Sequence, residues 1–118
     1  MYIYEGDREA ARVDVALAQT EEERNSGLMG VDAMPFNTGM LFLFDGEKPR
    51  SFWMVNTPLS LDILFINSNR EIIRIRNNTT PYSDREITSE GPAQYVLEVN
   101  AGFTREYDIR EGMRITWE

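Results

Sequence analysis

The chain has 118 residues, of which 42% are hydrophobic and 27% are charged. This composition is typical of a globular protein with one hydrophobic core, so we expect a single domain over residues 1–118. The sequence contains neither histidine nor cysteine, which excludes disulfides, cysteine or histidine metal sites and catalytic triads that use histidine. We predict no cofactor and no metal site, so any chemistry would depend on carboxylates, hydroxyls, arginines or the one lysine.

The charge of the chain points away from nucleic acid. Acidic residues number 20 against 12 basic ones, a formal net charge of -8 at pH 7. The basic residues are scattered singly, whereas phosphate binding depends on clustered positive charge, so we predict no nucleic-acid partner. No apolar run approaches the roughly 20 residues that a membrane span requires, so we predict no membrane insertion and expect a soluble monomer or weak dimer.

The start of the chain bears on its cellular location. Residues 1–11 lack the basic start and apolar stretch of a signal peptide, so we expect none in this sequence. The location stays open, because the protein would be exported if a leader preceded Met1 and cytoplasmic otherwise.

The first predicted elements are a strand and a helix. Residues 13–17 alternate apolar and polar side chains, as a strand with one buried face does. Thr20 followed by three glutamates predicts a helix start, because the side chains of Thr20 and Glu23 can each accept a backbone N–H of the other residue. Gly27 is placed to end this helix.

The most apolar segment predicts further strands. Residues 40–44 are apolar on both faces, and we expect the Asp-Gly pair at 45–46 to end this strand. A second strand is expected over residues 50–55. Residues 61–66 and 71–75 are two β-rich runs joined by a tight turn, which predicts a hairpin.

The last third of the chain begins with the one long irregular stretch, residues 77–92, and such a loop is uncommon in a small domain unless it is functional or mobile. Strands are expected at 94–99 and 113–117, with a short helix at 103–109 between them. Six or seven short strands with one or two small helices predict a mainly β fold, an antiparallel sandwich or a partly closed barrel.

Several phrases of the sequence occur together, in order and spacing, in one known family. They are Arg24-x-x-Gly27-Leu28-Met29, Gly39-Met40-Leu41-Phe42-x-Phe44, Phe52-Trp53-Met54-x-Asn56-Thr57, Leu61-Asp62-Ile63-Leu64-Phe65, Pro92-Ala93-x-Tyr95-Val96-Leu97-Glu98-Val99, Ala101-Gly102 and Gly112. Over about residues 12–117 the chain resembles the prokaryotic family known as domain of unknown function 192. The resemblance implies a mainly β, jelly-roll-like sandwich, often found behind a signal peptide. It implies no activity, because the family is uncharacterised.

Two positions depart from the family pattern. The family commonly has a basic residue where this chain has Val55, and often a proline where this chain has Ser60. If that basic residue binds an anion in the relatives, this protein binds the anion poorly or not at all.

The first candidate site is the polar group Asn56, Thr57 and Asp62, between the two most apolar strands and close in sequence to Trp53. A buried Asp62 carboxylate is costly unless it is hydrogen-bonded or paired. One interpretation is structural, with Asp62 and Asn56 bonded to the backbone of the connection between the strands. The other is a site for a small ligand or cation beside Trp53.

The second candidate is Glu98, which shares a strand with several apolar residues. One interpretation pairs it with Arg24, a common way to satisfy a buried carboxylate. The other brings Glu98 and Asp62 together as a general acid and base.

Trp53 and the methionines near it in sequence also have two interpretations. They either fill the core or line an apolar pocket, to which Tyr82 and Tyr95 could add aromatic surface.

Three functions remain open. We favour a non-catalytic binding or accessory module for a small polar ligand or a protein partner. The residues expected to form its site are Arg24, Trp53, Asn56, Thr57, Asp62 and Glu98. An enzyme that uses Asp62 and Glu98 is the first alternative, and it requires both carboxyl groups in one open cleft. A structural or assembly protein without a ligand is the second, for which a large exposed apolar patch would be the sign.

Overall fold

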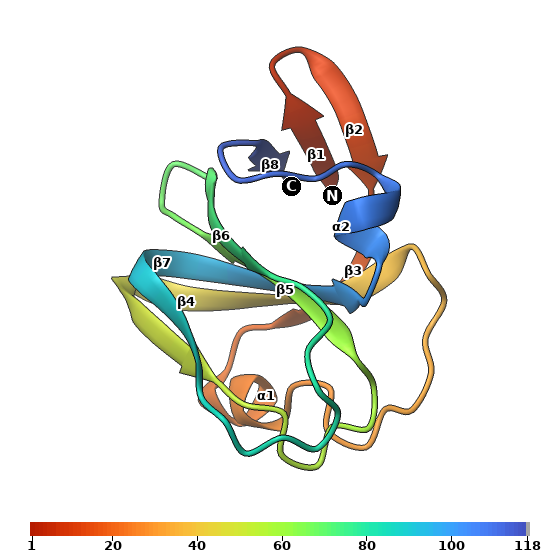
Figure 1. The fold of residues 1–118 in the computed structure, drawn as a ribbon. Helices are drawn as coiled ribbons and strands as arrows, with labels where there is room; N and C mark the ends of the chain where they lie inside the picture. The colour runs from red at the N-terminus through yellow and green to blue at the C-terminus, as the bar shows by residue number, and fades with distance from the viewer. Residues whose placement is uncertain (118) are drawn as a thin grey trace.

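The structure is a computed structural model that describes residues 1–117. Over these residues the chain forms eight strands and two short helices (Figure 1). The elements are β1 (Tyr2–Glu5), β2 (Arg8–Arg12), β3 (Asp14–Ala18), α1 (Glu21–Ser26), β4 (Thr38–Phe52), β5 (Leu61–Ile66), β6 (Ile72–Arg76), β7 (Ile87–Asn100), α2 (Phe103–Glu106) and β8 (Arg114–Thr116). Neither of these helices is long and apolar enough to cross a bilayer.

Five strands form the sheet that runs through the middle of the molecule (Figure 1). Their order is β3-β4-β7-β5-β6, with β3 parallel to β4 and all other neighbours antiparallel. β7 is the central strand, because it pairs with β4 on one side and β5 on the other. A second sheet, of order β2-β1-β8, places the start of the chain beside its end, since Tyr2 pairs with Thr116.

Both faces of the five-stranded sheet are buried, which divides the core into two parts. All six residues of β5 are buried, and successive side chains point to opposite faces. Leu64 and Ile66 belong to the core shared with the three-stranded sheet and α2, here called the α2-side core. Ile63 and Phe65 belong to the core on the side of α1 and its neighbouring loops, here called the α1-side core. This double burial explains why these strands read as continuous apolar runs.

The prediction of a mainly β fold is confirmed, and so is the helix after residue 20. The backbone N–H of Glu23 donates to Thr20 Oγ1 at 3.1 Å, and the Glu23 carboxylate accepts the N–H of Thr20 at 3.0 Å. Gly27 follows the last helical residue as predicted. The hairpin of β5 and β6 is also present.

Several predicted boundaries are wrong. The pair at residues 45–46 does not end a strand, because β4 continues through register shifts to Phe52 and joins two predicted strands into one. β7 already begins at Ile87, so the irregular segment is shorter than predicted, and α2 ends at Glu106. The strands β1 and β2 lack a clear alternating pattern and were not predicted.

The predicted buried face of the first strand is also wrong in part. Leu17 is 44% exposed, although alternation predicts that it faces the core with Val13, which is fully buried. β3 is an edge strand of the five-stranded sheet and pairs in parallel with β4 only. Near its end it is Ala18, rather than Leu17, that enters the α1-side core.

Gly39 sets how closely β4 approaches β7. A Cβ at this position would lie 2.3 Å from the backbone oxygen of Glu98, so the two strands would have to move apart. We predict that Gly39→Ala lowers the free energy of unfolding by about 2 kcal/mol or more. Urea denaturation measures this loss.

Gly46→Ala, on the same strand, is the matched control. A Cβ there meets no atom within 4 Å, so its effect should stay within about 0.5 kcal/mol. Equal effects of the two substitutions would contradict the close approach at Gly39.

Candidate functional site

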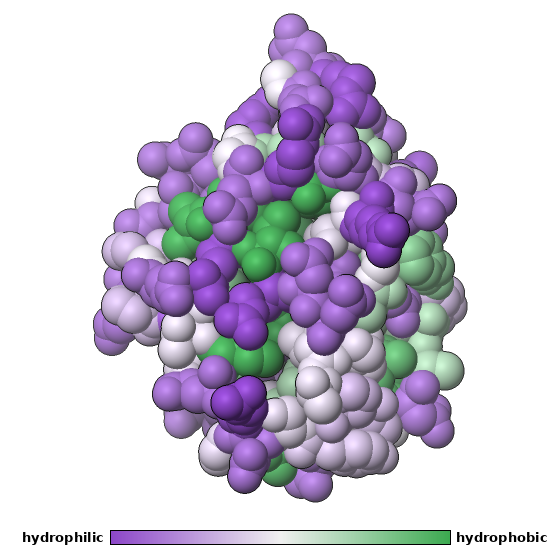
Figure 2. Space-filling model, viewed as in Figure 1, coloured by the Kyte–Doolittle hydropathy of each residue, from purple (hydrophilic) through white to green (hydrophobic). Residues whose placement is uncertain are grey.

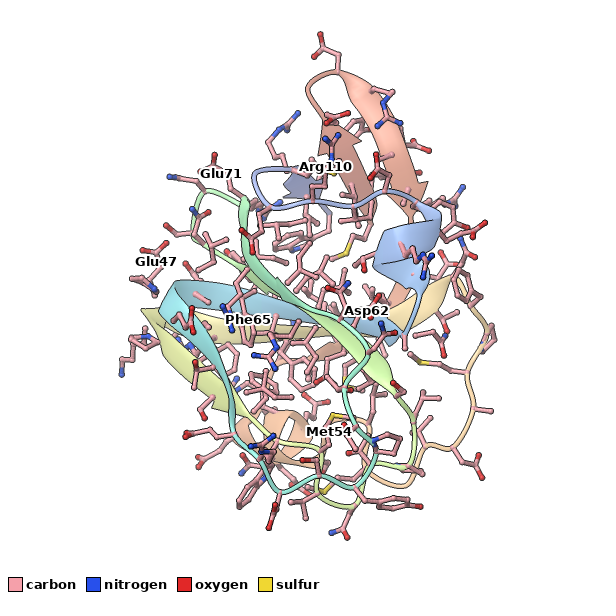
Figure 3. All side chains as sticks on the ribbon, in the orientation of Figure 1. Glu47, Met54, Asp62, Phe65, Glu71 and Arg110 are labelled. Carbon is pink, nitrogen blue, oxygen red and sulfur yellow. The ribbon has the colours of Figure 1, made fainter. Side chains whose placement is uncertain are left out.

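A cavity of about 480 Å³ lies on the α1 side of the five-stranded sheet, bounded by α1, β4, β7 and the turn that follows β4. Its wall combines aromatic and aliphatic side chains, among them Phe52, Trp53, Met54 and Leu61, with polar residues in nearly equal number. Figure 3 shows Met54 among the loops on the α1 side, away from Asp62 beside α2. Four of the polar residues are charged in water: Glu21, Arg24, Arg50 and Glu98.

Glu98 is the buried ionisable group among the described residues that line the cavity. It is placed by β7, where it lies opposite Met40 of β4 and Ile63 of β5. The residue is only 5% exposed, and within residues 1–117 its carboxyl group makes no hydrogen bond or ion pair. Burial raises the pKa of Glu98 to about 8, because water no longer solvates the charged form. At neutral pH the group is therefore mainly a neutral carboxylic acid that opens into the cavity.

Two arginines contact the Phe44 ring. The guanidinium carbon of Arg50 lies 3.9 Å from the ring centroid and that of Arg24 lies 5.1 Å from it. Both are cation–π contacts, which hold each cation without neutralising its charge. Arg24 Nη1 also donates to the carbonyls of Gln19 at 2.6 Å and Leu43 at 2.9 Å. The site therefore keeps two fixed positive groups close together.

Arg50 is anchored by β4 and β7. Its Nε donates to the carbonyl of Ala93 at 3.0 Å, and its Nη2 donates to the carbonyl of Gly46. Burial lowers the pKa of Arg50, the charge of Arg24 lowers it further, and Asp45 acts in the opposite direction. No carboxylate of residues 1–117 lies within ion-pair distance of either Arg24 or Arg50.

Trp53 and Met29 form part of the outer wall of the cavity. Trp53 is 59% exposed and Met29 is 41% exposed, so neither is a core residue, whereas Met54 is buried in the α1-side core. Of the two tyrosines considered with Trp53, Tyr95 lies in the α2-side core against Trp117 and Tyr82 is 65% exposed. The aromatic part of the wall is therefore made by phenylalanines and Trp53.

Asn56 and Thr57 lie in the turn after β4. Asn56 has φ 58°, a left-handed conformation that asparagine tolerates better than most residues. Its carbonyl accepts the N–H of Gly30 at 2.8 Å, which ties the turn to the segment after α1. Thr57 is buried and lines the cavity, whereas Asn56 does not line it.

Asp62 lies on the other face of the sheet and is fully buried. One carboxylate oxygen accepts the N–H of Asn78 at 2.9 Å. The other accepts the N–H of Gly102 at 3.2 Å, the N–H of Thr104 at 3.0 Å and the hydroxyl of Thr104 at 2.7 Å. Gly102, the N-cap of α2, has no side chain to cap the helix, so Asp62 supplies the missing acceptor from β5.

The two carboxyl groups proposed as an acid and base do not share a cleft. Glu98 is directly paired with Ile63 and Asp62 with Val99. Because neighbours along a strand alternate between faces, Glu98 points to the α1 side and Asp62 to the α2 side. The structure also has no ion pair between Arg24 and Glu98, although both line the cavity. Of the six predicted site residues, it brings together Arg24, Trp53, Thr57 and Glu98.

The departures from the family pattern lie near this site but outside the cavity wall. Val55 belongs to the turn after β4 and does not line the cavity. Ser60 Oγ donates to the carbonyl of Thr79 at 2.6 Å and so ties the start of β5 to the loop before β7.

Arg50 is the site residue that sequence reasoning missed. In the sequence it stands only at the start of an apolar phrase. Its role depends on β4 continuing past residue 46, which brings Arg50 back over the ring of Phe44. An arginine at the edge of the phrase that begins with Phe52 was the available signal, but no local pattern identifies Phe44 as its partner.

The fold and the site define a mainly β protein with a cavity of small-molecule size on one face of its central sheet. The chain belongs to the domain of unknown function 192 family (DUF192, "Uncharacterized ACR"), whose profile matches residues 3–117. The resemblance predicted from the sequence is thereby confirmed, and the match begins earlier in the chain than residue 12.

The chain is similar to a curated protein and to two proteins of known structure. The UPF0127 protein TK1120 of Thermococcus kodakarensis is 28% identical over 122 residues, which cover 99% of this chain and 73% of that protein. A crystal structure of a protein of unknown function from Novosphingobium aromaticivorans is 30% identical, with a TM-score of 0.93 over 98% of this chain and 82% of that one. A crystal structure from Sinorhizobium meliloti, provisionally described as a transcription regulator, is 42% identical, with a TM-score of 0.83 over 85% of this chain and 78% of that one.

The four hydrogen bonds of Asp62 generate a stability prediction. Asp62→Ala leaves the buried donors of Thr104 and the part-buried N–H groups of Gly102 and Asn78 without an acceptor, so we expect a loss of about 3 kcal/mol or more. Thermal and urea unfolding measure this loss. Asp14→Ala, at an exposed position of β3, is the control and should have little effect, whereas an unchanged melting temperature in Asp62→Ala would show that Asp62 has another role.

Glu98 generates a prediction of pH dependence. Its pKa is about 8 in the folded protein and near 4.5 when the side chain is solvated, so the folded state keeps a proton that the unfolded state loses between these values. The contribution of Glu98 to stability is therefore fully present below about pH 4.5 and is lost as the pH rises towards 8.

Glu98→Gln resembles the neutral acid and has no such loss. The melting temperature of Glu98→Gln relative to wild type should therefore rise steadily from pH 5 to pH 8, because the other titrating groups are shared by both proteins. Melting curves that stay parallel over this range would contradict the raised pKa.

Proposed function

We propose that this protein is a non-catalytic binding domain for a small polar molecule, which it takes into the cavity on the α1 side of the central sheet. The observation that carries the proposal is Glu98, a buried carboxyl group that faces the cavity without a hydrogen-bond partner in residues 1–117. A carboxyl group that is 5% exposed and lacks a partner is poorly solvated, which is destabilising. A ligand in the cavity would supply the missing partner.

The dimensions and chemistry of the cavity support this proposal. A volume of about 480 Å³ falls in the range of pockets that hold small organic ligands. Such pockets commonly combine an apolar or aromatic wall with a few oriented polar groups, as Trp53 and Met54 do here with Arg24, Arg50 and Glu98.

The other functions considered have less support. The carboxylate enzyme needs Asp62 and Glu98 in one cleft, but they point to opposite faces of the sheet. A structural or assembly protein would show a large exposed apolar patch. Polar residues cover most of the face shown in Figure 2, with hydrophobic residues visible between them. The provisional description of the Sinorhizobium relative suggests nucleic acid, but a net charge of -8 with scattered arginines disfavours that partner for this chain.

We further propose that the protein is a monomer or weak dimer.

A thermal-shift screen tests the proposal. The panel contains sugars, small carboxylic acids, phosphate esters and neutral aromatic amides, each added to the purified full chain. A ligand at about 100 times its dissociation constant stabilises the folded state by about 2.7 kcal/mol, a readily visible shift. Trp117→Phe leaves Trp53 as the only tryptophan, so fluorescence in that background reports on the cavity directly.

Glu98→Leu and Glu106→Leu form a matched pair for the hits. Glu98→Leu should abolish the thermal shift, because it replaces the polar group of the cavity with an apolar one. Glu106→Leu, at an exposed position of α2, should keep the shift. A panel with no effect on either the melting temperature or Trp53 fluorescence would overturn the small-ligand proposal and favour a protein partner.

A further inference from the structure

We infer that the ligand is a small organic anion whose negative group binds between Arg24 and Arg50 and whose apolar body lies against Trp53 and Phe52, with the Glu98 carboxyl group as a further polar contact. This inference rests on the proposed function and names the ligand class of the same cavity. The chemistry is shared by carboxylates and phosphate esters.

The two arginines carry positive charge that no carboxylate neutralises within residues 1–117. Arg24 and Arg50 are held on one phenylalanine ring, Phe44, and neither has a carboxylate within ion-pair distance among residues 1–117. Two neighbouring cations repel one another, and the lowered pKa of Arg50 reflects both that repulsion and burial. An anion bound between them would relieve the repulsion and gain charge-assisted hydrogen bonds from both.

Both arginines keep N–H donors that make no hydrogen bond within residues 1–117. Arg24 uses Nη1 for its two carbonyl contacts, and Arg50 uses Nε and Nη2. Arg24 Nε and Nη2 and Arg50 Nη1 therefore have no partner in the described part of the chain. Apart from Arg74 Nε, that part has no fully buried side-chain nitrogen or oxygen without a partner, so these three donors remain accessible. The carbonyl contacts fix the guanidinium groups while leaving N–H groups for a ligand.

Part of the cavity wall is apolar and accessible. Trp53, Met29 and Phe52 offer a surface against which an apolar group is stabilised by burial, whereas a wholly polar molecule would gain little there. A ligand that matches both this surface and the arginines has an anionic head and an aliphatic or aromatic body. Inorganic phosphate alone would use only the arginines.

Glu98 is compatible with an anionic ligand when its carboxyl group is neutral. An ionised glutamate in the cavity would repel an anion, but burial raises the pKa of Glu98 to about 8, so the group is mainly neutral at pH 7. A neutral carboxyl group can donate its O–H to a ligand oxygen. The other charged groups around the cavity are Glu21 and Arg24 from α1, with Arg50 and Asp45 from β4. Both Glu21 and Asp45 are acidic, but they are exposed to solvent.

The test compares ligands that differ in charge or in their apolar body. Wild-type protein is titrated at pH 6.5 and low ionic strength with benzoate, its uncharged counterpart benzamide, phenyl phosphate and inorganic phosphate. The readouts are thermal shift and Trp53 fluorescence in the Trp117→Phe background. We expect benzoate or phenyl phosphate to bind at least about tenfold more tightly than benzamide. The stronger of the two identifies the head group as a carboxylate or a phosphate.

Variants of the arginines locate the anion. Arg24→Gln and Arg50→Gln should each weaken binding of the preferred anion about tenfold to a hundredfold, as the loss of a charged hydrogen-bond donor does. Arg105→Gln, at an exposed position of α2 on the far side of the sheet, should bind like wild type. Far-UV circular dichroism confirms that each variant is folded, and the comparison of benzoate with benzamide on wild-type protein does not depend on any variant.

The role of Glu98 has its own readout. Benzoate stays ionised between pH 6.5 and 9, so a fall of about tenfold in its affinity over this range reports the ionisation of Glu98. In Glu98→Gln the affinity should stay nearly constant. A fall of equal size in both proteins would remove Glu98 from the site.

The outcomes separate this inference from the proposed function. If neutral probes bind as tightly as their anionic counterparts, or if the arginine variants bind anions like wild type, the anion inference is overturned and the binding function stands. If no probe changes the melting temperature or the fluorescence of Trp53, both are overturned.

Discussion

The pairing of β7 with β4 on one side and β5 on the other is the constraint on which the rest of the structure depends. A central strand with both faces buried must send alternate side chains into two separate cores. Leu97 and Val99 enter one core, while Val96 and Glu98 face the other. This alternation places a carboxyl group on the wall of the cavity, and it requires Gly39 where β4 approaches most closely.

Features with a local sequence signal could be predicted, whereas features that depend on distant residues could not. Continuous apolar runs predicted β5 and the core of the sheet, and the threonine and glutamate of the capping box predicted α1, because both signals are local. The fold of residues 40–55 was missed because a bulged strand crosses an Asp-Gly pair that normally ends one. The polar residues could be listed from the sequence, but their partners could not, since Asp62 bonds to residues up to 42 positions away.

The register between β5 and β7 explains why Asp62 and Glu98 have different roles. Asp62 and Glu98 are both buried carboxyl groups near the same strands, and sequence alone treats them alike. A difference of one position in the pairing of β5 with β7 sends them to opposite faces. Asp62 then meets four donors near α2 and acts as the cap that Gly102 lacks. Glu98 meets an apolar wall and a cavity instead.

The absence of an ion pair between Arg24 and Glu98 follows from where each group is held. Arg24 is fixed by the carbonyls of Gln19 and Leu43 and by the ring of Phe44, so it does not reach the carboxyl group. Without a cation in contact, burial governs Glu98 and favours its neutral form. If the two groups were paired, their charges would cancel and the cavity would lose its positive character. Held apart, they leave two cations and a neutral acid around one space, an arrangement that an anionic ligand completes.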